Sequence, residues 1–163
     1  MIAATARDVD QLALESQVCF ALATTNRAVL AVYRPLLEPL GLTHPQYLVM
    51  LALWDHRKAP ASDQFPLSVK RIAAALQMDS ATLSPMLKRL EGQGLIRRVK
   101  NTADERTTDV MLTQRGIALR ERALEVPPAV VARLGVELAE LENLHRVLTR
   151  INAAAVAAGA LRP

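Results

Sequence analysis

The chain has 163 residues, the size of one ordinary domain, and a net charge of +4 at pH 7. Hydrophobic residues make up 51% of it but aromatic residues only 3%, and 27 alanines and 26 leucines supply most of the apolar content. This composition favours helices and disfavours a β-sandwich or barrel, whose strands need aromatic and β-branched residues. The longest apolar runs, 47–54 and 153–161, are far shorter than the ~20 residues of a membrane span.

The sequence lacks the residue patterns of common enzymes and metal proteins. Its single cysteine, Cys19, excludes an intramolecular disulfide and a thiolate zinc cluster. No HExxH pair, phosphate-binding loop, dinucleotide-binding turn or nucleophile elbow is present. We therefore expect no metal, no cofactor and no enzymatic activity. Charged residues at positions 7, 8 and 10 precede any apolar run that could serve as a signal peptide, which predicts a cytoplasmic protein.

The first third of the chain is predicted to be helical. Apolar residues at helical spacing predict a helix over 9–33, which should end before Pro35. A bend is expected over 36–43, because this stretch contains a proline and a glycine. A second helix, capped by a threonine, is predicted over 45–56, and its apolar residues lie nearly all round, which indicates burial. The polar stretch 57–66 predicts a surface loop.

Two short helices and a β-hairpin are predicted in the middle of the chain. Ser68 can cap a helix over 69–76, and Asp79 can cap a second helix that runs through Leu90 or Glu91. Two short helices joined by about three residues form a helix-turn-helix pattern. Two alternating stretches, 95–100 and 107–113, then predict strands on either side of a polar turn. A hairpin directly after such a helix pair makes a winged helix.

The last third is predicted to hold a short helix over 114–124, ended by Pro127 and Pro128, and a long helix over 129–158. A 30-residue helix is ~45 Å long, more than a small domain covers by itself. Its apolar stripe favours a dimer in which the first and last helices of two subunits interlock; packing on the chain's own first helix is the alternative. The predicted fold is therefore mainly α with a small β-hairpin: a single domain over 1–163, with a winged-helix core at about 45–125 and dimerisation helices at about 8–40 and 126–160.

Positive charge is concentrated in the predicted winged helix. Residues 66–120 hold ten Lys or Arg against five Asp or Glu, a net +5, whereas the rest of the chain sums to −1. Such a concentration favours a phosphate-binding surface, although a solvated helix face is the simpler explanation. The second helix of the pair would enter a DNA major groove. Its candidate contact residues are Ser80, Thr82, Ser84, Lys88 and Arg89. Pro85 lies either inside this helix or at its first turn, with Ser84 as the cap.

The predicted hairpin carries further basic residues. Arg97, Arg98 and Lys100 lie along one strand, and Arg106 lies at or just past the tip. A guanidinium on a narrow tip can enter a minor groove, and Asp104 could hold it in one orientation.

Two of these segments resemble a known family. The stretch DSATLSPMLKRLE at 79–91 resembles the recognition helix of the MarR family of dimeric winged-helix repressors, and ADER at 103–106 resembles its Asp-x-Arg wing signature. The segments 17–22, 33–42 and 45–50 are similar to one branch, the organic-hydroperoxide repressors called OhrR. The resemblance covers roughly residues 10 to 125.

The resemblance to OhrR implies a redox sensor. In that branch the cysteine aligned with Cys19 senses peroxide, and its sulfenic acid is capped by a low-molecular-weight thiol in the one-cysteine type. Two tyrosine hydroxyls from the partner subunit stabilise the thiolate. Tyr33 aligns with one of them, whereas His44 stands where the branch has the other, so the chain departs from the pattern there. We interpret Tyr47 as a packing residue. A buried, inert cysteine is the simpler interpretation of Cys19.

The predicted function is therefore that of a homodimeric repressor. It would bind a pseudo-palindromic double-stranded DNA operator with half-sites about one helical turn apart, and release it when an organic hydroperoxide oxidises Cys19. One alternative is a repressor released by a small aromatic or phenolic ligand, with Cys19 not redox-active. Others are a one-cysteine thiol peroxidase and a winged helix that makes only protein contacts.

Overall fold

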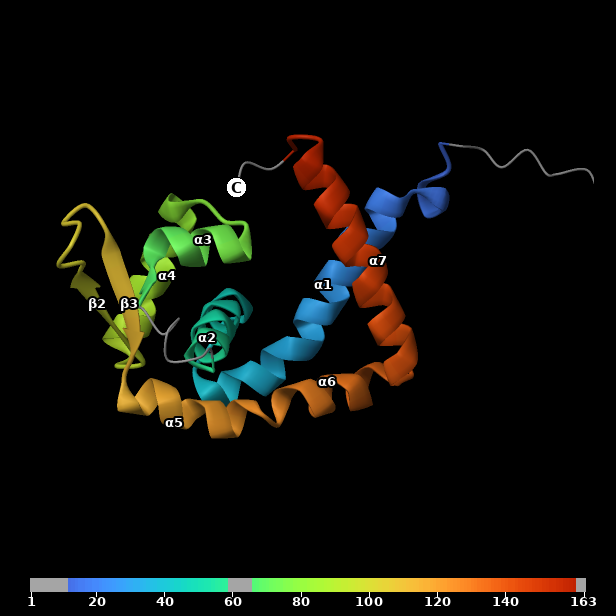
Figure 1. Ribbon diagram of the computed structural model, residues 1–163. Coiled ribbons are helices and arrows are strands. Elements are labelled where there is room, and N and C mark those ends of the chain that lie inside the picture. Colours follow the sequence, from blue (N-terminus) through green and yellow to red (C-terminus); the bar gives the residue numbers. More distant parts are fainter. Residues whose placement is uncertain (1–11, 59–65, 161–163) are drawn as a thin grey trace, which may run out of the picture.

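The computed structural model describes residues 12–58 and 66–160. Helices α1, α6 and α7 lie on one side of the molecule, away from the strands, and we call these three helices the arm (Figure 1). The other side holds α2, α3, α4 and the three strands, and α5 connects the two parts along the lower edge; we call α2 to α5 with the strands the winged-helix unit. The elements are η1 (Leu14–Ser16), α1 (Val18–Leu37), η2 (Glu38–Leu40), α2 (His44–Arg57), β1 (Leu67–Ser68), α3 (Val69–Leu76), α4 (Ser80–Gly92), β2 (Ile96–Lys100), β3 (Thr108–Leu112), α5 (Gln114–Ala123), α6 (Val126–Leu134) and α7 (Leu138–Ala157).

The winged-helix unit begins its helices at the predicted capping residues. The Ser68 side chain accepts from the amide of Arg71 at the start of α3, and Asp79 Oδ1 accepts from the amide of Thr82 at the start of α4 at 2.7 Å. Thr43 caps α2, with its own amide donating to the side chain of Gln46. Each cap satisfies an amide that the first turn of a helix leaves without a partner. The predicted helix pair is confirmed.

The three strands form one antiparallel sheet in the order β1-β3-β2. The predicted hairpin of β2 and β3 is confirmed, with Lys100 opposite Thr108 and Ile96 opposite Leu112. The sequence analysis missed β1, which pairs Leu67 with Val110. A two-residue strand is too short to show the alternation that identifies a strand.

The core of the winged-helix unit contains the apolar faces of its helices. Leu83, Leu87 and Leu90 of α4 are completely buried. On α2, Trp54 is buried and its indole N–H donates to the carbonyl of Gly116 in α5 at 2.9 Å. These contacts fix α4 on the body of the unit, so its opposite face is left for solvent or a ligand.

The prediction for the first helix was wrong at both ends. α1 starts at Val18, after a 3-10 turn and an extended Gln17, and it continues through Pro35 to Leu37. Proline in the last turn removes one hydrogen bond, and the burial of Leu37 at 1% exposure compensates for that loss. The predicted start of this helix before residue 12 and most of the predicted loop over 57–66 lie outside the described residues.

The predicted long helix over 129–158 was also wrong, because it is two helices. Gly135 adopts a left-handed conformation, with φ +62°, and ends α6 before α7 begins at Leu138. Pro127 and Pro128 do not separate elements as expected. They lie in the first turn of α6, where a missing amide hydrogen has no helical partner to lose.

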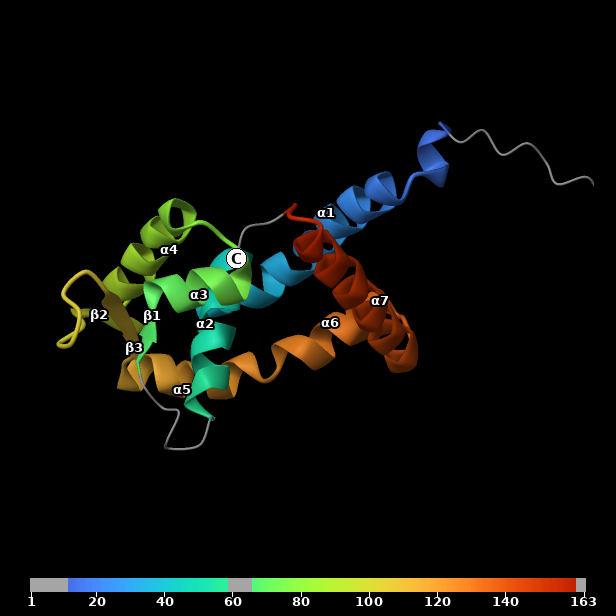
Figure 2. The ribbon, with the colours of Figure 1, turned by 45° about the horizontal axis from the view of Figure 1, so that its top comes forward.

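Figure 2 shows that the N-terminal half of α1 and α7 lie on the side of the molecule far from the sheet. Much of their apolar surface is exposed, including Val18 at 66%, Leu138 at 58% and Ile151 at 45%. No helix in the described part of the chain combines the length and apolarity that crossing a membrane requires.

Candidate nucleic-acid interface and cysteine site

The N-terminal part of α4 presents a row of short polar side chains to solvent. Ser80, Ser84 and Lys88 are four residues apart and therefore lie on one stripe of the helix, and all three are exposed. Pro85 lies inside α4, one turn and a half from its start, so the alternative in which Ser84 caps the helix is wrong. The Ser84 hydroxyl instead donates to the carbonyl of Ser80 at 2.7 Å. The stripe is thus a fixed polar surface opposite the buried leucines.

Asp79 controls the conformation of the first turn of α4. Its carboxylate accepts from both the amide and the hydroxyl of Thr82, at 2.7 and 2.8 Å. These hydrogen bonds, the amide's first, lower the pKa of Asp79. Asp79 is therefore ionised near neutral pH, and the Thr82 hydroxyl, having donated its hydrogen, can only accept from a ligand.

Arg89 does not share the stripe of Lys88. It is exposed, but it lines a cavity of about 910 Å³ between α1, α2 and α4, together with Arg34 and His44. The sequence analysis named Lys88 and Arg89 together as candidate DNA contacts. Adjacent helical residues point about 100° apart around the helix axis, so the two side chains face different surroundings.

Arg98 forms a two-pronged contact with Glu91 rather than projecting freely. Its amide and its Nε donate to the carboxylate of Glu91 at 2.8 Å each, and its Nη2 lies 2.7 Å from Glu91 Oε2. These hydrogen bonds lower the pKa of Glu91. The pair joins the C-terminal end of α4 to the first strand of the wing, so the position of the wing is fixed relative to α4.

The other basic residues of β2 point to different faces of the hairpin. Because side chains alternate along a strand, Arg97 lies on the face opposite Arg98 and Lys100. Both Arg97 and Lys100 are exposed, and the guanidinium of Arg97 contacts the sulfur of Met111 at 3.9 Å.

The wing tip is shaped by two side chains that accept from its backbone. Asn101 Oδ1 accepts from the amides of residues 103 and 104, and Asp104 accepts from the amide of Arg106 and the hydroxyl of Thr107, each at 3.0 Å. We expected Asp104 to hold the guanidinium of Arg106. The carboxylate orients the backbone instead, and among the described residues the guanidinium has no polar partner. Arg106 therefore projects a free cation from a rigid turn.

The predicted cysteine site is only partly assembled within one chain. Cys19 is exposed in the first turn of α1. Tyr33 lies 14 residues further along the same helix, which is about 21 Å at 1.5 Å per residue. Tyr33 and His44 do meet, with ring centroids 5.0 Å apart in an edge-to-face arrangement. One chain thus holds two components of the site at one end of α1 and the cysteine at the other.

Tyr47 joins this aromatic cluster, with its ring centroid 6.1 Å from that of Tyr33. Burial raises the pKa of both tyrosine hydroxyls and lowers the pKa of His44. At neutral pH the tyrosines therefore carry their hydrogens and His44 is a neutral imidazole. None of the three side chains forms a hydrogen bond with another described residue. Elsewhere among the described residues, no group of three or more His, Cys, Asp or Glu is placed to hold a metal ion.

Comparison with known proteins identifies the family. A model of the MarR family matches residues 42–108. The chain is 39% identical over 137 residues to the organic hydroperoxide resistance transcriptional regulator of Bacillus subtilis (strain 168), an alignment that covers 82% of this chain and 88% of that protein. It is also 39% identical over 155 residues to the HTH-type transcriptional regulator TtmR of Methylorubrum extorquens (strain PA1), covering 93% and 75% of the two chains. The chain belongs to the MarR family.

The fold agrees with this membership, and the chain is a transcriptional regulator of the MarR type. The structure of reduced AbfR bound to DNA matches with a TM-score of 0.74 at 30% identity, covering 90% of this chain and 94% of that one. The MarR-type relatives described above are named as regulators and not as enzymes.

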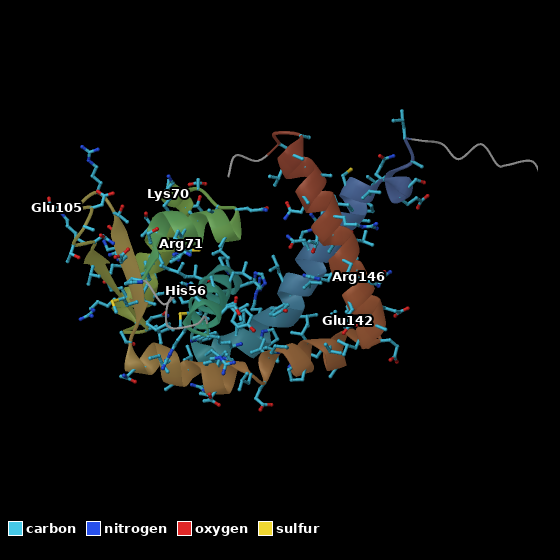
Figure 3. All side chains as sticks on the ribbon, in the orientation of Figure 1. His56, Lys70, Arg71, Glu105, Glu142 and Arg146 are labelled. Carbon is cyan, nitrogen blue, oxygen red and sulfur yellow. The ribbon has the colours of Figure 1, made fainter. Side chains whose placement is uncertain are left out.

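In this MarR-family chain the sequence analysis passed over two exposed cations. Lys70 and Arg71 lie in the first turn of α3 (Figure 3). Both belong to the basic segment 66–120, but only the second helix of the pair was predicted to contact DNA. Two adjacent cations at the start of the first helix were the available signal, since that helix crosses the phosphate backbone in helix-turn-helix proteins.

Proposed function

We propose that this MarR-family regulator is a homodimeric repressor that releases its DNA operator when an organic hydroperoxide oxidises Cys19. In this proposal it acts in the cytoplasm, where the DNA is, and it has no catalytic turnover. The dimerisation helices are those of the arm, and the winged-helix unit binds DNA.

The exposed polar stripe of α4 is the observation that carries DNA binding. A helix with Ser80, Ser84 and Lys88 along its open face fits a major groove about 12 Å wide. The wing lies beside it at a position fixed by the Glu91–Arg98 pair, and the free guanidinium of Arg106 suits the negative potential of the adjacent minor groove. Thr82, Arg97, Lys100 and Arg89 then supply further phosphate or base contacts, and Asp104 contributes by shaping the tip.

The exposed apolar residues of the arm support the dimer. Leu144, Leu148 and Ile151 are spaced by four and three residues along one stripe of α7 and are 37% to 45% exposed. Covering the exposed two-fifths of one such side chain contributes about 0.6–1.2 kcal/mol, and a two-fold dimer covers the stripe on both chains. A two-fold dimer would place two winged-helix units side by side on half-sites about one helical turn apart, which explains a pseudo-palindromic operator.

The same dimer would complete the cysteine site. Cys19 and the Tyr33–His44 pair lie at opposite ends of α1, so two antiparallel copies of α1 bring the cysteine of one subunit to the aromatic pair of the other. Two groups able to donate a hydrogen bond would then face the sulfur, the Tyr33 hydroxyl and one N–H of neutral His44. Such donors stabilise a thiolate, which is the reactive form of cysteine.

The oxidation step balances with one hydroperoxide and one thiol. The Cys19 thiolate attacks the outer oxygen of the hydroperoxide, the O–O bond breaks, and the alkoxide leaves as an alcohol after taking a proton. Sulfur is oxidised by two electrons to a sulfenic acid while the peroxide is reduced. A low-molecular-weight thiol then attacks the sulfenic sulfur, a disulfide bond forms and water leaves. A capped sulfur no longer fits between two donors, and the resulting shift of the arm would move the DNA-binding units apart.

A titration with cumene hydroperoxide tests this proposal. With one equivalent of free cysteine per chain present as the capping thiol, wild-type protein bound to a duplex selected from a random pool should be released after about one equivalent of oxidant per chain, because a coupling of ~3 kcal/mol weakens binding more than a hundredfold. The Cys19→Ser variant should stay bound. Retention of the duplex by oxidised wild type, or release of the duplex from Cys19→Ser, would contradict the sensor. Turnover of many equivalents with a thiol reductant would favour a peroxidase.

One alternative keeps the DNA-binding unit but makes the signal a small ligand. It is supported by the cavity of about 910 Å³ between α1, α2 and α4, which has apolar walls and two guanidiniums, those of Arg34 and Arg89. An aromatic or phenolic anion would fit that chemistry. Release of the duplex by salicylate under reducing conditions, equally in wild type and Cys19→Ser, would select this function.

A further inference from the structure

We propose that Gln93 and Arg122 are positioning residues that lock the winged-helix unit at a fixed angle to the arm, and so set the separation of the two DNA-binding surfaces in the dimer. This inference rests on the proposed function, because it concerns how that function tolerates changes in operator spacing. Neither residue lies on the DNA-binding stripe of α4 or on the wing.

The chain crosses between the arm and the winged-helix unit at two described places. One crossing runs from α1 through η2 to α2, and the other runs from α5 to α6; η2 and α5 are in contact. The buried core also spans the two parts, since Leu37 of α1 and Val130 of α6 belong to it, but apolar contacts are not directional and leave the relative angle less sharply defined. A lock therefore requires bonds between the crossings, or between a crossing and α4.

Gln93 joins the end of α4 to the crossing between α1 and α2. It follows α4 directly, and its Nε2 donates to the carbonyl of Gly41, 52 residues away, at 2.8 Å. Gly41 closes η2 in a left-handed conformation, with φ +70°. The recognition helix is thus tied at its C-terminal end to the turn that ends the arm.

Arg122 joins the two crossings to each other. It lies in the last turn of α5, and its Nη2 donates to the carbonyl of Pro39 in η2 at 2.7 Å. The backbone bonds of the turn itself end on the carbonyls of Leu37 and Glu38, so the next carbonyls are available to accept from α5 and α4. The two crossings are joined to each other through η2.

The other half of the Gln93 amide distinguishes positioning from simple stabilisation. Its Oε1 is buried and has no hydrogen-bond partner among the described residues. Turning the amide over would aim this oxygen at the Gly41 carbonyl, so the orientation is fixed. A buried acceptor without a partner lowers stability, and an apolar side chain of the same length would avoid that loss. The Gln93 amide therefore fixes the orientation of α4 relative to η2 at some cost in stability.

The lock has a consequence for operators of different spacing. Two rigidly held DNA-binding surfaces bind both half-sites only at one separation, whereas two loosely held surfaces tolerate several. Removing one bond should leave the affinity for a single half-site unchanged, because the DNA-contacting residues are intact. It should relax the dependence of full-operator affinity on spacing.

The test compares wild type with Gln93→Met and Arg122→Met, with Arg115→Met as the control. Arg115 is an exposed arginine of the same α5 helix, so its loss matches the charge change of Arg122→Met. The probes are the duplex that wild type selects from a random pool, its isolated half-site, and full duplexes with one or two base pairs inserted between half-sites. Wild type and the control should lose about tenfold or more in affinity on insertion of two base pairs, and the two lock variants about threefold or less. Half-site affinities should agree within about twofold.

A second measurement does not depend on DNA or on the dimer. In a Cys19→Ser background, spin labels at Glu105→Cys on the wing tip and Glu142→Cys on α7 report the distance between unit and arm in one chain (Figure 3). Labelled chains are diluted with unlabelled ones. The distance distribution should broaden in Gln93→Met and Arg122→Met but not in Arg115→Met.

The outcomes separate the two proposals. An unchanged distance distribution together with wild-type spacing dependence would overturn the lock, as would an equal loss of half-site and full-operator affinity. If wild type selects no duplex, the proposed function fails, and the distance measurement still decides whether the lock exists.

Discussion

The wing-tip guanidinium gives the sharpest quantitative test of DNA binding. In Arg106→Ala the amide of residue 106 still donates to Asp104, and the lost guanidinium has no polar partner in the described structure. The free energy of unfolding should therefore change by less than about 0.5 kcal/mol. A base or groove contact contributes about 1–3 kcal/mol, and a dimer has two wings, so operator binding should weaken by about 2–6 kcal/mol. That range corresponds to a loss of about 30-fold to 10⁴-fold.

The salt dependence of the same variant provides a second number. If each guanidinium neutralises one phosphate-equivalent charge, the slope of log affinity against log salt should become shallower by about 1.8 for the dimer. Fluorescence anisotropy at several salt concentrations measures both quantities. Arg115→Ala, which removes an exposed arginine of α5 outside the arm and the wing, is the control and should change neither. Wild-type affinity and slope in Arg106→Ala would refute the placement of the wing on DNA.

Three further predictions follow from local geometry. Gly116→Ala should lower the melting temperature by many degrees, because a Cβ would lie 2.0 Å from a backbone carbonyl oxygen, whereas Gly92→Ala, with nothing within 4 Å, should not. Burial lowers the pKa of His44 in the folded state, so as the pH falls the unfolded chain takes up this proton before the folded chain does. The free energy of unfolding, measured with urea, should therefore be highest above about pH 6.5 and decrease below it. The decrease should be less steep in His44→Asn. Asp104→Ala should weaken DNA binding in spite of the lost negative charge, whereas Glu105→Ala at the same tip should strengthen it slightly, both by anisotropy.

The winged-helix unit could be predicted because its signals are local. Ser68 and Asp79 cap their helices in the structure as their positions in the sequence indicate. The buried leucines of α4 follow a helical period, and the two long strands alternate around a polar turn. Each of these features depends on residues only a few positions apart, so a single sequence contains the information.

The errors arose where tertiary burial or a single glycine decided the structure. Pro35 predicted the end of a helix, but Leu37 is buried two residues later and the helix extends to it. Gly135 lies within a helical apolar pattern, and only its left-handed conformation shows that the pattern is two helices. The third strand is visible only through its pairing with β3.

The candidate site shows the same division. The sequence identified the basic residues of the wing, but not that Arg98 is engaged by Glu91 or that Arg89 faces a cavity shared with the arm. Long-range pairs of this kind depend on packing, which one sequence does not determine. The proposed role of His44 would likewise require two chains, because one chain places it at the opposite end of α1 from Cys19.

Sedimentation velocity on the chain, with and without its selected duplex, decides whether two copies of the chain bind DNA together. We expect a dimer in the absence of DNA, and a complex of two chains on one duplex that dissociates as salt is raised. A single-chain species that does not change its sedimentation when the duplex is added, at any salt concentration, would contradict this expectation.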